Sequence, residues 1–380
     1  MGRKKIRIWP FRFFVPLLFC SLWLYTPVFG HAAQESSGYV PDYGDIQAFL
    51  DEQDAELSFG EMVDQLVSGN WSEIPGILLS QAGSFLFSEI RKNKNELFFL
   101  FAIAIFGGIF TNFAKAFRGG YAAQTGFYVT CLMLAVTLLG AFTAASRITL
   151  DFLTTLLGFM KALIPAFFLS VAYVGSPLAS AGFYQTTLLA IGGAEWVFLK
   201  VLMPLIRIYL TFGLIDGIVG EDFLARLAKL VKRGTEWGMK TLFSAVLGLQ
   251  FIQGMILPYA DNVKTGAVKK MAGLIPGVGK GISAVAELLT GSGILIKNGI
   301  GTAAFFCLVF FSLVPLLKLA VIFFLYQLAA ALLAPAADKR LLGCVDAMAA
   351  AVGMLLKMTG MTVLLFGLSI ALVCVATSVK

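Results

Sequence analysis

The chain has few charged residues and only one histidine, and both shortages narrow the range of functions that it can have. Charged residues make up 13% of its 380 residues, against about 25% in an average soluble protein. The one histidine, His31, lies near the N-terminus. Zinc sites built on H-E-x-x-H and catalytic groups of the Ser-His-Asp or Cys-His type therefore have no candidate in the body of the chain.

Cysteine and nucleotide-binding patterns are also missing. No two cysteines form a C-x-x-C pair that could begin a metal site. Five residues separate Gly273 from Gly279 where a phosphate-binding loop needs four, and Gly281 replaces the Ser or Thr that would bind magnesium. Carboxylates are too scattered for a dinuclear site. We expect no enzyme, no cofactor and no metal.

The chain has instead a succession of apolar runs, each about one bilayer long. They approach the roughly 17–25 residues that a helix needs to cross the hydrocarbon core, and they comprise Leu97–Phe113, Gly126–Ala145, Val201–Val219, Ile300–Leu317 and Met361–Val379. Because lipid offers the backbone no hydrogen-bond partner, each run is expected to be helical. The expected fold class is all-α, a polytopic integral membrane helical bundle of about six to nine spans.

The net charge of +7 fits this class without nucleic acid. The basic residues cluster at the ends of apolar runs, where they orient helices and meet anionic lipid.

The N-terminus, 1–33, has the layout of a signal peptide. Five basic residues precede the apolar run Phe13–Phe29, and small residues follow at Gly30, Ala32 and Ala33. The alternative is an uncleaved signal anchor.

A short acidic segment, 34–95, follows and is predicted to be an extracytoplasmic helical domain. Its apolar residues sit at the spacing of short amphipathic helices: Ile46, Phe49, Leu50, Leu57, Met62, Val63 and Leu66. About sixty residues bury little surface alone, so the segment is expected to lean on the membrane or on a partner.

The first membrane helix group, 96–258, contains further short runs. Phe152–Tyr173 contains Lys161 and Pro165, so it is expected to be either a kinked span or a surface helix with a buried end. Phe183–Phe198 is a further short run, and Phe223–Arg233 has the pattern of a basic helix on a membrane surface. If the signal peptide is cleaved, alternation of the spans places this basic helix in the cytoplasm, as the positive-inside rule requires.

Four charged residues in this group lie within or beside apolar runs, where ionisable groups are costly and often functional. Glu195, Lys200, Arg207 and Asp216 bracket a possible polar path. The alternative is that Glu195 and Lys200 mark a turn between short helices, while Arg207 extends to the interface. The pair Gly213 and Gly217 suggests close helix packing.

The element 259–299 is broken by glycine and proline and precedes the C-terminal membrane helix group, 300–380. It is predicted to be re-entrant or interfacial, facing a pore or a partner, or else an amphipathic helix pair on the outer surface. Its candidate contact residues are Pro276, Gly277, Gly279, Lys280, Lys297 and Asn298.

Four stretches resemble stage III sporulation protein AE of endospore-forming bacteria. They are Gly273–Lys280, Leu295–Gly301, Lys318–Ala330 and Cys344–Asp346. The order of signal sequence, acidic segment and polytopic region is similar too, although Ala334-Pro335 stands where Gln-Pro is expected.

The resemblance implies a component of a secretion-like channel between mother cell and forespore that sustains late forespore gene expression. It implies a location in the mother-cell membrane around the forespore, in a hetero-oligomeric complex with other stage III A proteins and a forespore-side partner. Two alternatives stay open: a secondary transporter or transporter permease, which should show an internal repeat, and a non-conducting membrane scaffold of the same complex.

Overall fold

The computed structural model describes residues 42–53, 58–67, 121–173, 177–219, 222–272, 279–334 and 338–376. Every element in these ranges is helical, which confirms the all-α expectation for them. The predicted signal peptide at 1–33 and the apolar run at 97–113 lie outside the described residues.

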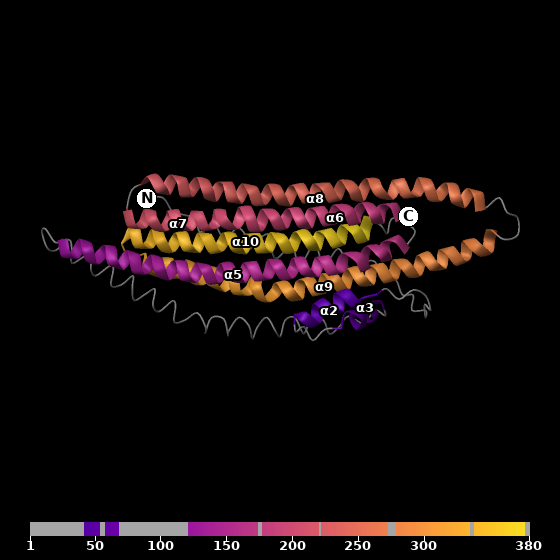
Figure 1. The fold of residues 1–380 in the computed structure, drawn as a ribbon, viewed down its shortest axis with the longest axis horizontal. Helices are drawn as coiled ribbons and strands as arrows, with labels where there is room; N and C mark the ends of the chain where they lie inside the picture. The colour runs from indigo at the N-terminus through magenta and orange to yellow at the C-terminus, as the bar shows by residue number, and fades with distance from the viewer. Residues whose placement is uncertain are drawn as a thin grey trace.

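Five long helical rods lie side by side in an elongated bundle (Figure 1). Two short helices, α2 (Gly44–Glu52) and α3 (Phe59–Val67), lie against one side of it. The rods are α5 (Tyr121–Tyr173), α6 (Pro177–Val197) joined to α7 (Met203–Val219) by the π-helical turn η1 (Phe198–Leu202), α8 (Asp222–Ala272), α9 (Gly279–Leu333) and α10 (Lys339–Ala376).

The rods are longer than the sequence suggests. The expected spans Gly126–Ala145 and Phe152–Tyr173 both lie within α5, whose 53 residues extend about 80 Å at about 1.5 Å per residue. Residues 146–151 between them contain no glycine or proline, so nothing in the backbone ends the helix there. The expectation of two separate spans is therefore wrong, and the same holds for Phe183–Phe198 and Val201–Val219 along α6–η1–α7.

Among the described residues, four helical segments are long and apolar enough to cross a membrane. They are Thr125–Ala172, Tyr184–Val219, Ile294–Leu333 and Lys339–Val375. Within this part of the chain, pairs of expected spans merge into single rods.

One further expectation is corrected by α8. The basic helix predicted at Phe223–Arg233 is not a separate surface helix, because it continues into the 51 residues of α8 and packs against α7. The segment 259–299 is helical up to Ala272 and again from Gly279, and its re-entrant, interfacial or outer-surface placement stays a prediction. Residues 273–278 lie outside the described part.

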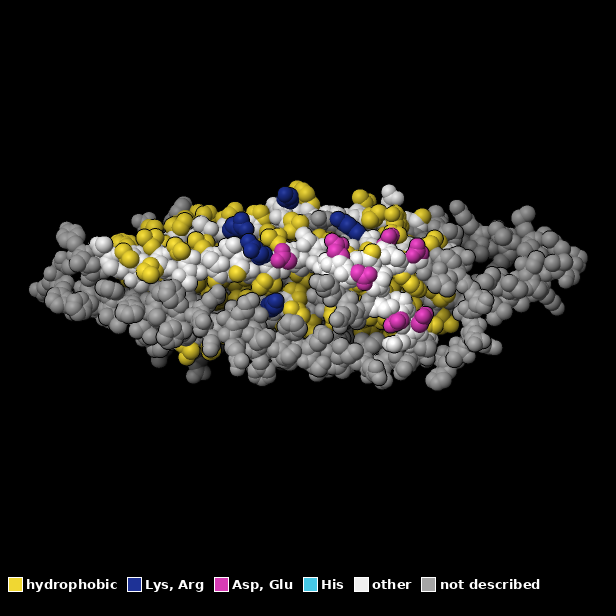
Figure 2. Space-filling model, turned by 60° about the horizontal axis from the view of Figure 1, so that its bottom comes forward, with side chains coloured by type: hydrophobic (Ala, Val, Ile, Leu, Met, Phe, Trp, Pro, Cys, Tyr) yellow, Lys and Arg dark blue, Asp and Glu magenta, His cyan; other side chains and the backbone are white. Residues whose placement is uncertain are grey.

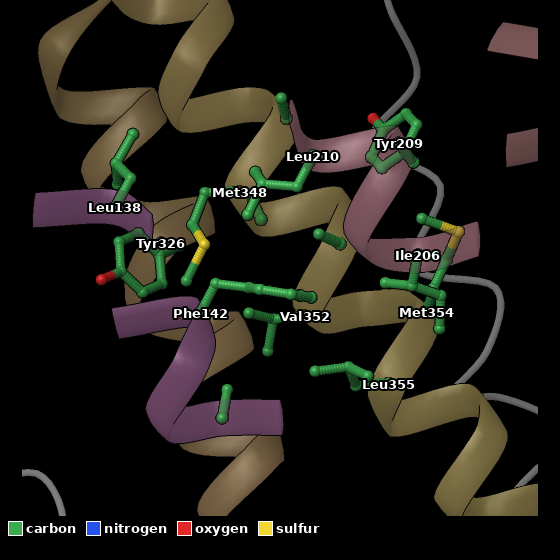
Figure 3. Packing of buried hydrophobic residues seen from close by; sticks show 14 of the residues in the cluster. Leu138, Phe142, Ile206, Tyr209, Leu210, Tyr326, Met348, Val352, Met354 and Leu355 are labelled. Atoms are coloured by element: carbon green, nitrogen blue, oxygen red, sulfur yellow. The ribbon is translucent and has the colours of Figure 1, made fainter. Parts of the chain in front are cut away.

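The core lies around α10, which contacts α5, α7, α8 and α9. Figure 3 shows Phe142 of α5 and Tyr326 of α9 beside Met348 and Val352 of α10. On the α7 side, a Cβ added at Gly213 would come within 2.6 Å of the Ala347 Cβ. The close packing predicted from Gly213 and Gly217 is therefore confirmed, and small residues let the two backbones approach.

The amphipathic spacing predicted for α2 and α3 is confirmed by burial of Ile46, Leu50, Val63 and Leu66. The two helices pack on α5 and α9. Phe49 contacts Phe159 and Phe311, with ring centroids 6.0 Å apart in both pairs, and Val63 and Val67 face Gly299.

Candidate functional site

The structure gives Asp216 a structural partner. Its Oδ1 accepts a hydrogen bond of 2.9 Å from the backbone N–H of Ala225, in the first turn of α8. The first N–H groups of a helix lack partners within the helix, and a carboxylate there also complements the helix dipole. Asp216 therefore caps α8. Lys200 and Arg207 are exposed, and the side chain of Glu195 lies outside the described set.

Lys297 has a different environment. It is fully buried, and its Nζ donates a hydrogen bond of 3.0 Å to the carbonyl of Cys374, near the C-terminal end of α10. Unpaired carbonyls and the negative end of the helix dipole favour a cation at this position. Asn298 beside it is half-buried.

The remaining candidates are not described in full. Pro276 and Gly277 lie outside the described residues, and Gly279 and Lys280 begin α9 without described side chains. Among the described candidates, Asp216 and Lys297 lie at opposite ends of α10. The structure therefore does not bring Asp216 and Lys297, two of the described candidates, together at one site.

What the structure does bring together is a belt of charges at mid-length of the bundle. Each of the five rods contributes to it, and none of the ten side chains is buried. The charged belt consists of Arg147, Asp151, Lys200, Arg207, Lys232, Arg233, Glu236, Lys240, Lys318 and Lys357.

Contacts between neighbouring helices place these residues at one level. Lys357 of α10 is 2.8 Å from Glu236 of α8, and Lys232 lies 5.9 Å from the centroid of the Tyr209 ring of α7. A Cβ at Gly238 of α8 would lie 3.4 Å from Leu202, next to Lys200.

The other two rods follow the same register. Phe323 of α9 packs against Gly353 of α10, and since the two helices are antiparallel, Lys318 falls beside the level of Lys357. Phe142 of α5 lies next to Val352 (Figure 3), and since these helices are parallel, Arg147 falls at this level too. Eight of the ten belt residues are Lys or Arg, so the belt is strongly positive.

Glu236 and Lys357 form an ion pair between α8 and α10. Partial burial by itself would raise the pKa of Glu236. The hydrogen bond from Lys357, together with the charges of Lys357, Lys232 and Lys240, outweighs burial and lowers this pKa. The carboxylate is therefore held ionised, and it joins α8 to α10.

Two more polar contacts attach α8 beyond the belt. Ser369 of α10 donates to Gln250 Oε1 at 2.8 Å, and Thr186 of α6 donates to Gln253 Oε1 at 2.7 Å. Together with the Asp216 cap and the Glu236–Lys357 pair, they bind α8 to three neighbours.

The sequence reasoning missed Lys357, Glu236 and Gln250. Lys357 is a single cation inside an apolar run, and the sequence alone shows this signal for a functional or paired residue. The sequence does not show which residue pairs with it, because Glu236 is 121 positions away along the chain and lies among several basic residues.

The comparisons with known proteins agree with the resemblance. The chain matches the sequence model of the family described as stage III sporulation protein AE over residues 57–377. It is 23% identical over 313 residues to stage III sporulation protein AE of Bacillus subtilis (strain 168), covering 82% of this chain and 78% of that protein. No solved structure matches the chain.

Proposed function

We propose, because the chain belongs to the stage III sporulation protein AE family, that it is a non-enzymatic, multispanning subunit of a secretion-like channel between mother cell and forespore. The family match carries this proposal, and it covers all the belt residues. The four helices long and apolar enough to cross a membrane support an integral membrane subunit.

The finer parts of the proposal concern place and partners. The subunit would lie in the mother-cell membrane around the forespore, with other stage III A proteins and a forespore-side partner. Lys200 and Arg207 point outward from the bundle, which favours a path between chains over a path through one chain. The same observation speaks against a secondary transporter with a central binding site.

The test is made in an endospore-forming host that produces this chain. Replacing the gene by Arg207→Ala and Lys318→Ala variants is followed by three measurements: membrane level, co-purification with stage III A proteins, and late forespore gene expression. A conduit predicts normal assembly with lost expression, whereas a scaffold predicts lost assembly. Sporulation that proceeds normally after deletion of the whole gene would refute both.

A further inference from the structure

The charged belt divides the described helices into two halves, and the short described helices α2 and α3 lie on only one of them. The bare half consists of the parts of α5 before Arg147, α7 after Arg207, α8 before Lys232, α9 after Lys318 and α10 before Lys357. The covered half consists of the remaining described parts of the rods and carries α2 and α3 on its surface. On the face shown in Figure 2, Lys and Arg lie near mid-length and most acidic side chains lie towards one end, while hydrophobic side chains occur along the whole described surface.

The bare half presents a continuous apolar surface on adjacent helices α5 and α9. No charged residue occurs from Tyr121 to Ser146, nor from Leu319 to Leu333. Nine large apolar side chains are exposed there: Tyr128, Val129, Leu132, Met133, Val136, Leu139, Phe324, Leu328 and Leu332. A large exposed apolar surface of this kind marks a site that contacts a membrane or another protein.

Cationic residues flank this surface at both of its edges. Arg147 and Lys318 belong to the belt at one edge, and Lys339 and Arg340 begin α10 at the other. From Lys339 to Lys357 the helix advances about 27 Å at about 1.5 Å per residue, close to the roughly 30 Å of a hydrocarbon core. Cations at both edges complement the phosphates of the two headgroup layers.

On the same side of the bundle the covered half carries exposed carboxylates, although its helices α6 and α8 also expose large apolar side chains, among them Leu188, Leu189, Phe251 and Ile252. Six carboxylates of α2 and α3 and their flanking residues are exposed: Asp42, Asp45, Asp51, Glu52, Glu61 and Asp64. The two helices are fixed by Phe49 against Phe159 and Phe311, and by Val63 against Gly299. Carboxylates are costly in hydrocarbon, and a bilayer would surround the whole bundle at this level.

From these contacts we infer that the bilayer covers only the bare half, between Lys339 and the charged belt, and that the covered half stands in water with α2 and α3. The basic residues Arg226, Lys229, Lys339 and Arg340 then gather towards one side of the membrane, which the positive-inside rule makes cytoplasmic. Arg226 and Lys229 lie in the first turns of α8, near this edge, and their long side chains can extend towards the headgroups. Asp346, about two turns into α10, is exposed in the same half, and this placement sets its carboxylate at membrane depth, where a charge is costly. The inference does not depend on the proposed channel function.

Single-cysteine variants of the full chain test this placement after reconstitution in liposomes. The native cysteines are replaced by alanine, and the background is accepted only if it stays helical and monodisperse. Leu132→Cys and Phe324→Cys report on the bare half, Leu189→Cys on the exposed apolar part of α6, and Glu61→Cys on α3. Each is labelled with a water-soluble maleimide, and a fluorophore attached in detergent is quenched with nitroxide lipids.

Leu132→Cys and Phe324→Cys should label on the order of tenfold more slowly than Glu61→Cys, because a low-dielectric environment suppresses the thiolate, and nitroxide lipid should quench them. Leu189→Cys should label quickly and escape quenching. Strong lipid quenching at Leu189→Cys, with or without quenching at Leu132→Cys, would overturn the placement.

A second pair needs no cysteine-free background. Val136→Lys should reduce the amount of chain in the membrane fraction, since it puts a charge into the lipid-facing surface, whereas Leu189→Lys should leave it unchanged. Equal losses, or a loss for Leu189→Lys alone, would contradict the inference.

Discussion

The helices α10 and α8 run along the same bundle but are held in different ways. α10 is enclosed by α5, α7, α8 and α9, and it meets α7 through small residues, with Gly217 against Cys344. α8 lies on the side of the bundle, where it buries Ala228, Met239 and Val246 and adds separate polar contacts through Asp216 and Gln253. The position of α10 thus depends on close packing on all sides, whereas that of α8 depends on one apolar face together with a few specific bonds.

This difference predicts that substitutions in the two helices affect the stability of the bundle differently. A closely packed interface resists any added volume, because neighbouring backbones cannot move apart cheaply. An interface held by separate hydrogen bonds and one ion pair can lose each of them at a cost of about 1 kcal/mol. Substitutions at α10 should therefore disturb the whole bundle, and those at α8 should loosen one helix.

The largest effect is expected for Gly217→Ala. The added Cβ would collide with the Cys344 Sγ and lie 3.1 Å from the carbonyl oxygen of Arg340, so we expect destabilisation of about 1–3 kcal/mol from overpacking. The measurement is the thermal unfolding of the detergent-solubilised chain.

Gly343→Ala on α10 is the matched control for this change. Nothing lies within 4 Å of its added Cβ, and alanine is the better helix former by about 1 kcal/mol. It should leave stability unchanged or raised. Equal effects at the two positions would refute the account of α10 as a helix held by shape.

The sequence predicts the parts of this contrast that depend on local pattern. Small residues at Gly213 and Gly217 indicate a close helix contact, and the spacing of Ile46 and Leu50 indicates an amphipathic helix. The continuity of α5 was not predicted, because residues 146–151, which include Arg147 and Asp151, interrupt the hydropathy between the two expected runs. Hydropathy reports what surrounds a helix and not where its backbone ends. Exposed charges at mid-length of a long helix interrupt the hydropathy while the helical backbone continues.

The attachment of α8 is harder to predict for a second reason. Asp216 and Arg207 look alike in sequence, as charges near an apolar run, yet one caps α8 and the other is exposed. Only the position of a neighbouring helix separates these roles, and that position is set by contacts between residues far apart in the chain.

A smaller effect is expected from reversing the Glu236–Lys357 pair. The two side chains are 31% and 35% exposed, so the pair contributes about 1 kcal/mol at most. Lys357→Glu removes the ion pair and places two carboxylates side by side. This substitution should therefore lower the unfolding temperature. The double variant Glu236→Lys with Lys357→Glu should recover part of the loss. Lys229→Glu, which reverses an exposed charge on the same helix that does not act on Glu236, serves as the control. A double variant less stable than both single variants would contradict a direct pairing.

Ser369→Ala should cost about 1 kcal/mol, because it leaves the buried Gln250 amide oxygen without this donor. Adding Gln250→Leu should restore part of that stability, since both polar partners are then replaced. Ser244→Ala on the exposed side of α8 is the control in the same unfolding assay. If the stability lost in the double variant equals the sum of the losses in the two single variants, the two side chains do not act as a pair.

The smallest effect is a pH dependence at Glu236, whose sign follows from its lowered pKa. Partial burial opposes ionisation, but the hydrogen bond and charge of Lys357, with Lys232 and Lys240, hold the pKa below the ordinary value of 4.5. Because the unfolded chain takes up this proton at higher pH than the folded chain, the stabilisation is fully present above about 4.5 and is lost as the pH falls through the folded-state value. Glu236→Gln should therefore be less stable than the parent chain at neutral pH, and the difference should shrink as the pH falls below about 4.5. Other carboxylates titrate in the same range, so the quantity measured is the difference in unfolding temperature between the two proteins. A difference that stays constant from pH 7 down to about pH 3 would show that the charge of Glu236 does not hold α8 against α10.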